Sequence, residues 1–319
     1  MAALALGRYS IPVNEVARIL IDQIYPLPRT WTDAEQQVVL SVRLPRVLLA
    51  MLIGGGLALG GAALQAVFRN PLVSPQVLGV SSGASFGGVL VMMLGLGSAA
   101  LVGGAFAFGL VALGIVMWIG KTGRGGSLLM IVLGGIVVSA LFSALVSLVT
   151  YLADPYTTLP SIVFWLMGSL ATANATKVLV AAVPILAGAT VVLALRWRVN
   201  ILSLGDDDAR SLGIDPGRLR AVLLTVVALM TAGAVAVGGV IGWVGLVVPH
   251  MARLWVGPDH RISMPTTFAL GAIYLTVIDT LSRTISTAEL PIGILTAIIG
   301  APVFVLLLRS TRRQAFIDA

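Results

Sequence analysis

Long stretches of apolar residues with almost no charged side chain dominate this sequence and restrict what the chain can fold into. Several of them run for 18 residues or more, the length at which an apolar stretch indicates a membrane-spanning α-helix. The sequence therefore predicts an all-α, polytopic transmembrane helical bundle. Nine spans are expected, at residues 47–68, 77–97, 98–119, 127–151, 176–196, 219–240, 242–256, 265–282 and 291–309.

The composition excludes a water-soluble protein of this size. Only 10% of the 319 residues are charged, whereas about a quarter are charged in a typical soluble domain, and 58% are hydrophobic. The chain has no cysteine, which excludes a disulfide framework, a thiolate metal site and a cysteine nucleophile. The net charge of +7 does not indicate a nucleic-acid partner, because the positive charges lie between the apolar spans.

Two parts of the chain depart from this pattern of long apolar spans. The seventh span is short and contains Pro249, His250 and Arg253, so we expect a broken or partly buried helix there. Residues 8–43 are amphiphilic and contain three prolines, which indicates a segment outside the membrane. We therefore expect a single integral membrane domain over residues 1–319, of which residues 1–43 are mostly periplasmic.

The basic residues alternate between the two ends of the predicted spans, and this alternation gives the orientation of the chain. Thirteen of the twenty fall in one set of connections: Arg69, Lys121, Arg124, Arg196, Arg198, Arg210, Arg218, Arg220, Arg253, Arg261, Arg309, Arg312 and Arg313. The other side has seven: Arg8, Arg18, Arg29, Arg43, Arg46, Lys177 and Arg283. The positive-inside rule places the first set in the cytoplasm. The C-terminus is then inside and, with nine spans, the N-terminus outside, so we expect one further span before Met1.

Few ionisable residues lie within the spans, where they are costly in lipid. Asp279 and Arg283 are four residues apart and can pair on one helix face. Either this pair fixes the end of a helix, or Arg283 contacts a partner protein. His250 is more typical of a hydrogen-bonded structural residue than of a ligand. The two histidines and the isolated carboxylates make no catalytic or metal-binding constellation, so we expect no enzyme activity from this chain.

One short motif resembles a nucleotide site without completing it. Gly120-Lys121-Thr122 is similar to the end of a phosphate-binding loop, which needs another glycine five residues before Gly120. That position is Ile115, and the residues before Lys121 form an apolar span. If ATP drives the function of this chain, a separate subunit must therefore supply the nucleotide site.

The segment 202–220, LSLGDDDARSLGIDPGRLR, is the most informative polar stretch. Three aspartates after Gly205 suit the positive end of a short helix, and Gly213 suits its C-terminal cap. The Asp-Pro-Gly sequence at 215–217 turns the chain into the next helix. The sequence therefore predicts two short helices separated by a turn on the cytoplasmic side. A helical connection of this length more often has a partner than an ordinary loop does.

Seven blocks occur along the chain in a fixed order: RLPR (43–46), NPLVSPQVLGVSSGA (70–84) preceded by Gln65, FWLMGSL (164–170), LGDDDARSLGI (204–214), GWVGLVVPHMAR (242–253), GPDHR (257–261) and ELPIGILTAIIGAPVF (289–304). Together they resemble the membrane permease subunits of the iron-siderophore, haem and cobalamin ABC importers, the type II importer class. The resemblance covers about residues 40–319.

The resemblance implies a fold and a set of partners. Permeases of that class have ten spans with both ends in the cytoplasm, so the nine predicted here would lack the first. Two permease copies form a homodimer around one path, two ATPase subunits bind ATP and Mg²⁺ below it, and a periplasmic substrate-binding protein docks above. The chain itself would hold no cofactor, and it would be a multi-pass protein in the lipid of the bacterial inner membrane.

The resemblance also assigns roles to particular residues. Docking of the binding protein falls to Arg43, Arg46 and Arg283, which the basic pattern independently places outside. Coupling to the ATPase falls to helices at about 199–218, with the residues Leu204, Gly205, Asp206, Asp207, Asp208, Ala209, Arg210, Ser211, Leu212 and Gly213. A cytoplasmic gate falls to Asn70, Pro71, Leu72, Arg124, Gly125 and Gly126.

Other functions compete with the importer interpretation. An ion- or proton-coupled secondary transporter would need carboxylates or polar gaps near the bilayer midplane, and Asp279 lies near one end of its span. A membrane enzyme would need the constellation that the sequence lacks. Among importer cargoes we favour a ferric siderophore ahead of haem. Cobalamin and an oxyanion such as molybdate stay open, because nothing in the sequence decides between them.

Overall fold

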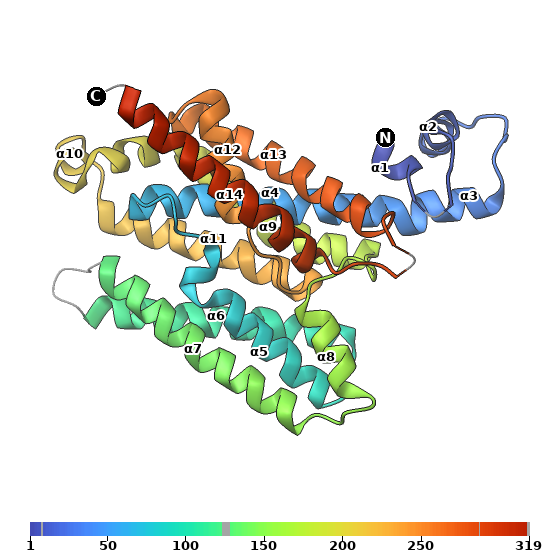
Figure 1. Ribbon diagram of the computed structural model, residues 1–319, viewed down its shortest axis with the longest axis horizontal. Coiled ribbons are helices and arrows are strands. Elements are labelled where there is room, and N and C mark those ends of the chain that lie inside the picture. Colours follow the sequence, from blue (N-terminus) through green and yellow to red (C-terminus); the bar gives the residue numbers. More distant parts are fainter. Residues whose placement is uncertain (8, 123–127, 287, 318–319) are drawn as a thin grey trace.

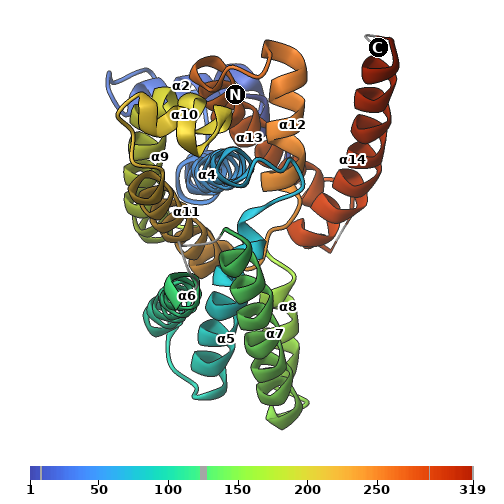
Figure 2. The same cartoon turned by 90° about the vertical axis from the view of Figure 1, so that its left-hand side faces the viewer.

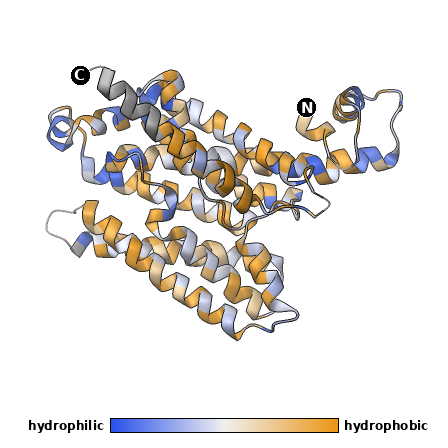
Figure 3. Cartoon of the chain, viewed as in Figure 1, coloured by the Kyte–Doolittle hydropathy of each residue, from blue (hydrophilic) through white to orange (hydrophobic). Residues whose placement is uncertain are grey.

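The computed structural model describes residues 1–7, 9–122, 128–286 and 288–317, and the regular structure within them is helical. Six of the described helices are long and apolar enough to cross a membrane (Figure 1): Asp33–Phe68, Ser98–Lys121, Leu128–Leu152, Ala175–Leu204, Pro216–Gly238 and His260–Ser282. Apolar residues cover them along most of their length, and polar residues gather toward the two ends of the molecule (Figure 3). The chain is therefore a multi-pass membrane protein.

Three shorter apolar helices, Val80–Met93, Val244–Val256 and Ile292–Leu307, coincide with the second, seventh and ninth predicted spans. They have fewer than the roughly 20 residues that a full crossing needs, so the count of nine complete spans stays a prediction. The short seventh helix is confirmed. It contains Pro249, which removes one backbone hydrogen bond from the helix.

The first span is part of a longer helix than expected. Residues 33–43, which the sequence assigned to a segment outside the membrane, continue the helix of the span as Asp33–Phe68. A capping box starts this helix, because the Thr32 hydroxyl accepts from the Glu35 amide while the Glu35 carboxylate accepts from the Thr32 amide. The helix comprises α3 (Asp33–Gln37), a π-helical segment (Val38–Arg43) and α4 (Leu44–Phe68).

The N-terminal residues fold back on the start of this helix. Two helices, α1 (Ala2–Ala5) and α2 (Val13–Asp22), lie beside it at one end of the molecule (Figure 1). A small apolar cluster holds them there, made of Leu4, Ala5, Ile11, Val16, Ile19, Trp31 and Val39. The cluster fixes backbone carbonyl groups of the N-terminal segment next to the beginning of α4.

The remaining helices form two groups around α4 (Figures 1 and 2). The first surrounds α4 and consists of α9 (Ala175–Leu204), α11 (Pro216–Gly238), α12 (Val244–Val256) and α13 (His260–Ser282). The second lies below it in both views and consists of α5 (Val80–Met93), α6 (Ser98–Thr122), α7 (Leu128–Leu152) and α8 (Thr158–Leu166). The last helix, α14 (Ile292–Ile317), stands at one side. α4 is consequently the central helix.

Glycines let α4 approach its neighbours closely. A Cβ added at Gly54 would lie 2.2 Å from the carbonyl oxygen of Gly271 in α13, and one at Gly61 would lie 1.9 Å from that of Gly245 in α12. Both distances are far inside van der Waals contact. No larger side chain therefore fits at these positions while the helices keep their spacing.

Irregular backbone at the ends of the shorter helices is hydrogen-bonded within the protein. The amide of Ser169 donates to the carbonyl of Gly238 at 2.9 Å, and the amide of Ile292 donates to the carbonyl of Gly168 at 2.9 Å. Polar backbone at membrane depth is tolerated only when protein or water satisfies it. These contacts allow the chain to leave helical geometry before α9, α12 and α14.

We expect Gly61→Ala to lower the stability of the protein, because its methyl group would meet the Gly245 carbonyl and force α4 away from α12. Overpacking of this kind costs about 1–3 kcal/mol. The matched control is Gly114→Ala in α6, where an added Cβ meets nothing within 4 Å and alanine favours the helix. Thermal unfolding of the purified protein in detergent measures both. Equal midpoints for the two variants would contradict the close packing.

Candidate functional site

The residues that the sequence assigned to docking and to coupling lie at opposite ends of the molecule. The docking arginines lie where α4 begins and where α13 ends, beside the N-terminal helices. The acidic helix α10 (Asp206–Ser211) lies at the other end (Figure 1). The structure therefore supports two separate candidate sites, connected by the length of α4.

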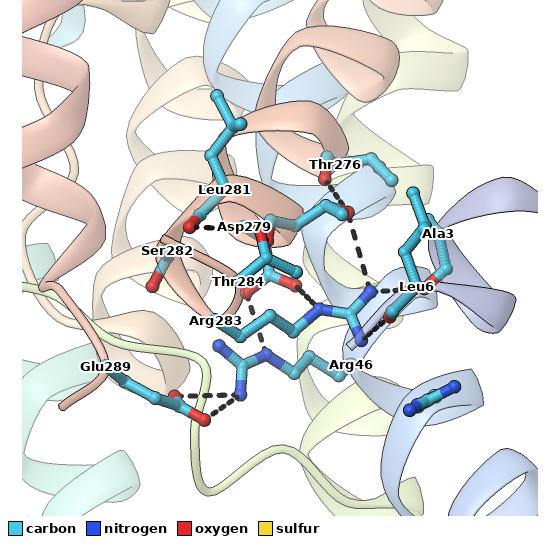
Figure 4. Close-up of polar contacts among 12 residues, drawn as sticks. Ala3, Leu6, Arg46, Thr276, Asp279, Leu281, Ser282, Arg283, Thr284 and Glu289 are labelled. Atoms are coloured by element: carbon cyan, nitrogen blue, oxygen red, sulfur yellow. Dashed lines mark hydrogen bonds and ion pairs between the residues drawn. The ribbon is translucent and has the colours of Figure 1, made fainter. Parts of the chain in front are cut away.

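Arg46 is the centre of a buried ionic cluster at the first end (Figure 4). Its Nε donates to Asp279 Oδ1 at 2.8 Å, and its Nη1 donates to both carboxylate oxygens of Glu289, at 3.1 and 2.9 Å. Asp279 is fully buried in α13, and Glu289 lies in the connection before α14. One guanidinium thus ties together the beginning of α4, the end of α13 and the approach to α14.

Arg283 completes the cluster from the last turn of α13. Its Nε faces Asp279 Oδ2 at 3.6 Å, so the pair predicted from the spacing of these residues is confirmed as an ion pair. Its two terminal nitrogens donate to the backbone carbonyls of Leu6 and Ala3. The N-terminal segment therefore supplies the hydrogen-bond acceptors for the terminal nitrogens of Arg283, while Asp279 faces its Nε.

Arg43 is held in the same way, but no carboxylate among the described residues pairs with it. Its guanidinium donates to the carbonyls of Leu4 at 2.7 Å and Ala5 at 2.9 Å, and also to that of Tyr9. Burial of a charge is tolerated when its hydrogen bonds are made, and carbonyl dipoles provide them here. The three arginines are only 4%, 5% and 6% exposed.

This arrangement qualifies the docking assignment. The positions of Arg43, Arg46 and Arg283 at one end of the bundle agree with the assignment, yet each guanidinium is turned inward and bonded within the chain. Direct pairing with the carboxylates of a binding protein stays a prediction, and it would require these contacts to open. Sequence reasoning found the Asp279–Arg283 pair because it is local, and missed the bonds to Arg46 because those partners are more than 200 residues away.

Asp206 makes the ion pairs that connect the acidic helix at the opposite end to two neighbouring helices. Asp206 accepts two hydrogen bonds from Arg220 of α11, at 2.8 and 2.5 Å, and forms a 3.3 Å ion pair with Arg69 at the end of α4. The hydrogen bond from Arg220 lowers the pKa of the Asp206 carboxyl below its usual value. The carboxylate therefore stays ionised at neutral pH, and the anchor is lost only as the pH falls through that lowered pKa.

The coupling segment has one short helix where the sequence predicted two. α10 begins after Gly205, whose φ is +147°, and the chain turns at Gly213, whose φ of +77° suits glycine. Asp215 then caps α11 by accepting from the amides of Gly217 and Arg218. Because this cap starts a helix that runs on to Gly238, the expected second short helix is the first turn of a membrane-spanning one.

The predicted gate residues lie next to this anchor. Arg69 ends α4 in the left-handed region with φ of +49°, and the turn that follows is held by Asn70, whose Oδ1 accepts from the Leu72 amide at 2.9 Å. Asn70 and Pro71 also line a cavity of about 330 Å³ together with Arg253. The other predicted gate residues, Arg124, Gly125 and Gly126, lie outside the described residues.

Comparison with known proteins gives the family. The model of the FecCD transport family matches residues 1–310. The chain is 44% identical over 311 residues to the molybdate import system permease protein MolB of Haemophilus influenzae, covering 98% of this chain and 92% of that protein. It is 40% identical over 275 residues to a probable iron chelatin transport system permease protein of Helicobacter pylori, covering 86% and 83%.

A solved structure agrees with these relatives. The inward-facing structure of a metal-chelate type ABC transporter matches with a TM-score of 0.88 and 43% identity, covering 97% of this chain and 94% of that one. Fold and relatives together define the class as an ABC transporter permease. The chain belongs to the FecCD transport family.

We expect Asp279→Asn to destabilise the protein strongly, because it leaves Arg46 and Arg283 buried with one carboxylate fewer between them. Removing one member of a buried ion pair costs about 3–5 kcal/mol. The matched control is Asp33→Asn, whose carboxylate pairs with Arg29 on the surface and contributes about 0–1 kcal/mol. Thermal unfolding in detergent compares the two variants. An Asp279→Asn midpoint equal to that of the control would show that the cluster contributes little.

Proposed function

We propose that this chain is the membrane-spanning subunit of an ABC importer in the bacterial inner membrane, driven by ATP that a separate subunit hydrolyses. The proposed assembly contains two copies of the chain, two ATPase subunits that bind ATP and Mg²⁺, and a periplasmic substrate-binding protein. The observation that carries the proposal is α10, a short acidic helix at one end of the bundle, anchored to two spans through Asp206. The family relationship supports it.

The anchor gives a physical route for coupling. A partner subunit that moves α10 would move Asp206, and with it Arg220 of α11 and Arg69 of α4. Arg69 is followed directly by the turn at 70–72, so the same movement would reach the predicted gate. Coupling of this kind needs an element with two arrangements that both ends can bias. In our proposal this element is the anchored assembly of α4, α10 and α11.

The opposite end is the proposed surface for the binding protein. Arg43, Arg46 and Arg283 fix the beginning of α4 and the end of α13, which gives a docking partner a defined surface. An arginine that turned outward could offer its planar fork to a carboxylate of that partner. The binding protein would then compete with Glu289 and with the carbonyls of the N-terminal segment for these guanidiniums.

α7 presents an apolar surface that is available to a second copy of the chain. Only 28% of the residues in its most apolar stretch are buried, and large side chains stay exposed along the helix: Leu129, Leu133, Ile136, Val137, Leu141 and Leu148. Either lipid or a second permease must cover this surface. In the proposed homodimer, part of it faces the other copy across the path.

For the cargo we propose a metal complex, with an iron chelate such as a ferric siderophore or haem as the first candidate. The likeness to the iron chelatin permease supports it. Molybdate is the second candidate, because the molybdate permease is 44% identical over nearly the whole chain. A cation-coupled secondary transporter is the competing mechanism, and it would not need a partner at α10.

We expect Asp206→Asn to uncouple ATP hydrolysis from transport, because α10 would lose its charge-assisted contacts with Arg220 and Arg69. The loss of such a contact, on the order of 1.5 kcal/mol, shifts the attached population by about tenfold. Transport per ATP hydrolysed, measured in proteoliposomes with the partner ATPase, should fall accordingly. The charge swap Asp206→Arg with Arg220→Asp should recover part of it. No recovery, or unchanged coupling in Asp206→Asn, would contradict the anchor.

We expect uptake into proteoliposomes to require ATP and the cognate binding protein, and to favour an iron chelate over molybdate. The panel contains a ferric siderophore, haem, cobalamin and molybdate, each with and without an imposed proton gradient. Uptake of molybdate alone would replace the first cargo candidate by the second. Uptake driven by the gradient without ATP would overturn the importer proposal.

A further inference from the structure

A cavity of about 640 Å³ lies between the end of α9 and the start of α11, beside the turn that follows α10. Its apolar wall includes Leu195, Ile201 and Val222. Arg198 and Arg218 stand at the same cavity, so it combines apolar surface with positive charge. Leu212 and Gly213 of the predicted coupling segment also line it, whereas Asp206, Arg220 and Arg69 of the anchor do not.

The location of the cavity is that of a membrane surface. α9 and α11 lie on the side of the molecule away from α14 (Figure 2). α9 buries only 28% of its most apolar window, and Leu179 and Val183 on its outer side are about 70% exposed, so this side of the bundle faces acyl chains. The cavity lies where α9 and the more buried α11 beside it reach their arginine-rich ends.

The charged groups around the cavity leave positive charge available. Arg198 makes no hydrogen bond or ion pair with the part of the chain that the structure describes. Arg218 is 90% exposed at its side chain and uses only Nε, at 3.3 Å, to contact Asp215. One carboxylate oxygen of Asp215, Oδ1, accepts the amide hydrogen bonds that cap α11. The terminal nitrogens of both arginines are therefore free to hold a phosphate.

The aromatic side chain of Trp197 lines the cavity together with its apolar residues and its arginines. Trp197 is 56% exposed, and the guanidinium of Arg261 lies 5.4 Å from its ring centre. Tryptophan is enriched at the level of lipid headgroups, where its ring is partly in the acyl region and its N–H is in water. Arg261 adds a third guanidinium beside the cavity, paired with Asp259.

We propose that this cavity is a binding site for one anionic phospholipid, whose phosphate contacts Arg198 and Arg218 and whose acyl chain lies along Leu195 and Val222. Basic pockets between spans at the cytoplasmic side bind anionic headgroups, and only an amphipathic ligand uses both the charged and the apolar parts of the cavity. A free phosphate would leave the apolar wall in water. The site is distinct from the Asp206 anchor, although both adjoin α10.

The test titrates the purified, delipidated chain with phosphatidylglycerol or with phosphatidylcholine of the same acyl chains, and counts bound lipids by native mass spectrometry. The wild type should prefer phosphatidylglycerol for its first lipid, and Arg198→Gln with Arg218→Gln should reduce this preference by about tenfold or more. Arg18→Gln with Arg29→Gln removes the same charge at the opposite end and should keep the preference. Brominated phosphatidylglycerol should quench the fluorescence of Trp197. The total quenching of tryptophan fluorescence should therefore be smaller in Trp197→Phe than in the wild type.

Each alternative occupant predicts a different result. Equal affinity of the wild type for the two lipids, or an unchanged preference in the Arg198 and Arg218 variant, would overturn the proposal. Displacement of the first lipid by millimolar inorganic phosphate would identify a free-anion site instead. Loss of that lipid when the ATPase subunit binds would assign the cavity to a protein contact. The arginines are exposed, so the variants should fold, and size-exclusion chromatography checks this.

Discussion

The close approach of α4 to α12 and α13 is the interaction on which the rest of the structure depends. It requires glycine at 54 and 61, because the carbonyls of the facing helices occupy the space that a side chain would fill. α4 is consequently 78% buried over its most apolar window, within a bundle whose outer helices stay largely exposed. The same rigid helix carries Arg46 at one end and Arg69 at the other, so both candidate sites are built on it.

Buried charge at the first end is stabilised by partners from distant parts of the chain. Two carboxylates cannot neutralise three guanidiniums, and the remaining acceptors are the backbone carbonyls of Ala3, Leu4, Ala5, Leu6 and Tyr9. Such carbonyls are available only because α1 and α2 pack against the beginning of the first long helix. The apolar cluster of the N-terminal region and the ionic cluster of Arg46 therefore stabilise each other, because the first positions the carbonyls that Arg43 and Arg283 bind.

At the other end of the molecule, most side chains of α10 are exposed rather than buried. α10 is attached by the ion pairs of Asp206 and by the buried Ala209, while Asp207, Asp208 and Arg210 are exposed. A short helix with one anchor can transmit a displacement to α4 and α11 without a core of its own. The proposed lipid cavity adjoins the same segment, so the membrane and a partner subunit would act on neighbouring surfaces of α10.

Local patterns in the sequence account for much of this protein. Apolar stretches long enough to cross a membrane located the helices, Pro249 indicated the short seventh one, and the i,i+4 spacing of Asp279 and Arg283 gave their ion pair. Two helix starts were missed although their signals are equally local: Thr32 and Glu35 form the capping box that starts the long first helix, and Asp215 caps α11 where a second short helix was expected.

The sequence by itself thus determined the membrane location and the helical class, because lipid imposes length and apolarity on every span, and its ordered motif blocks indicated the family. Only the tertiary structure decided which partner each charged side chain takes. Arg46 meets Asp279 and Glu289 across more than 200 residues, and Asp206 meets Arg69 across 137. These pairs form because the packing of α4 brings the ends of distant helices together, where a buried or half-buried charge must find an opposite charge or a hydrogen-bond partner.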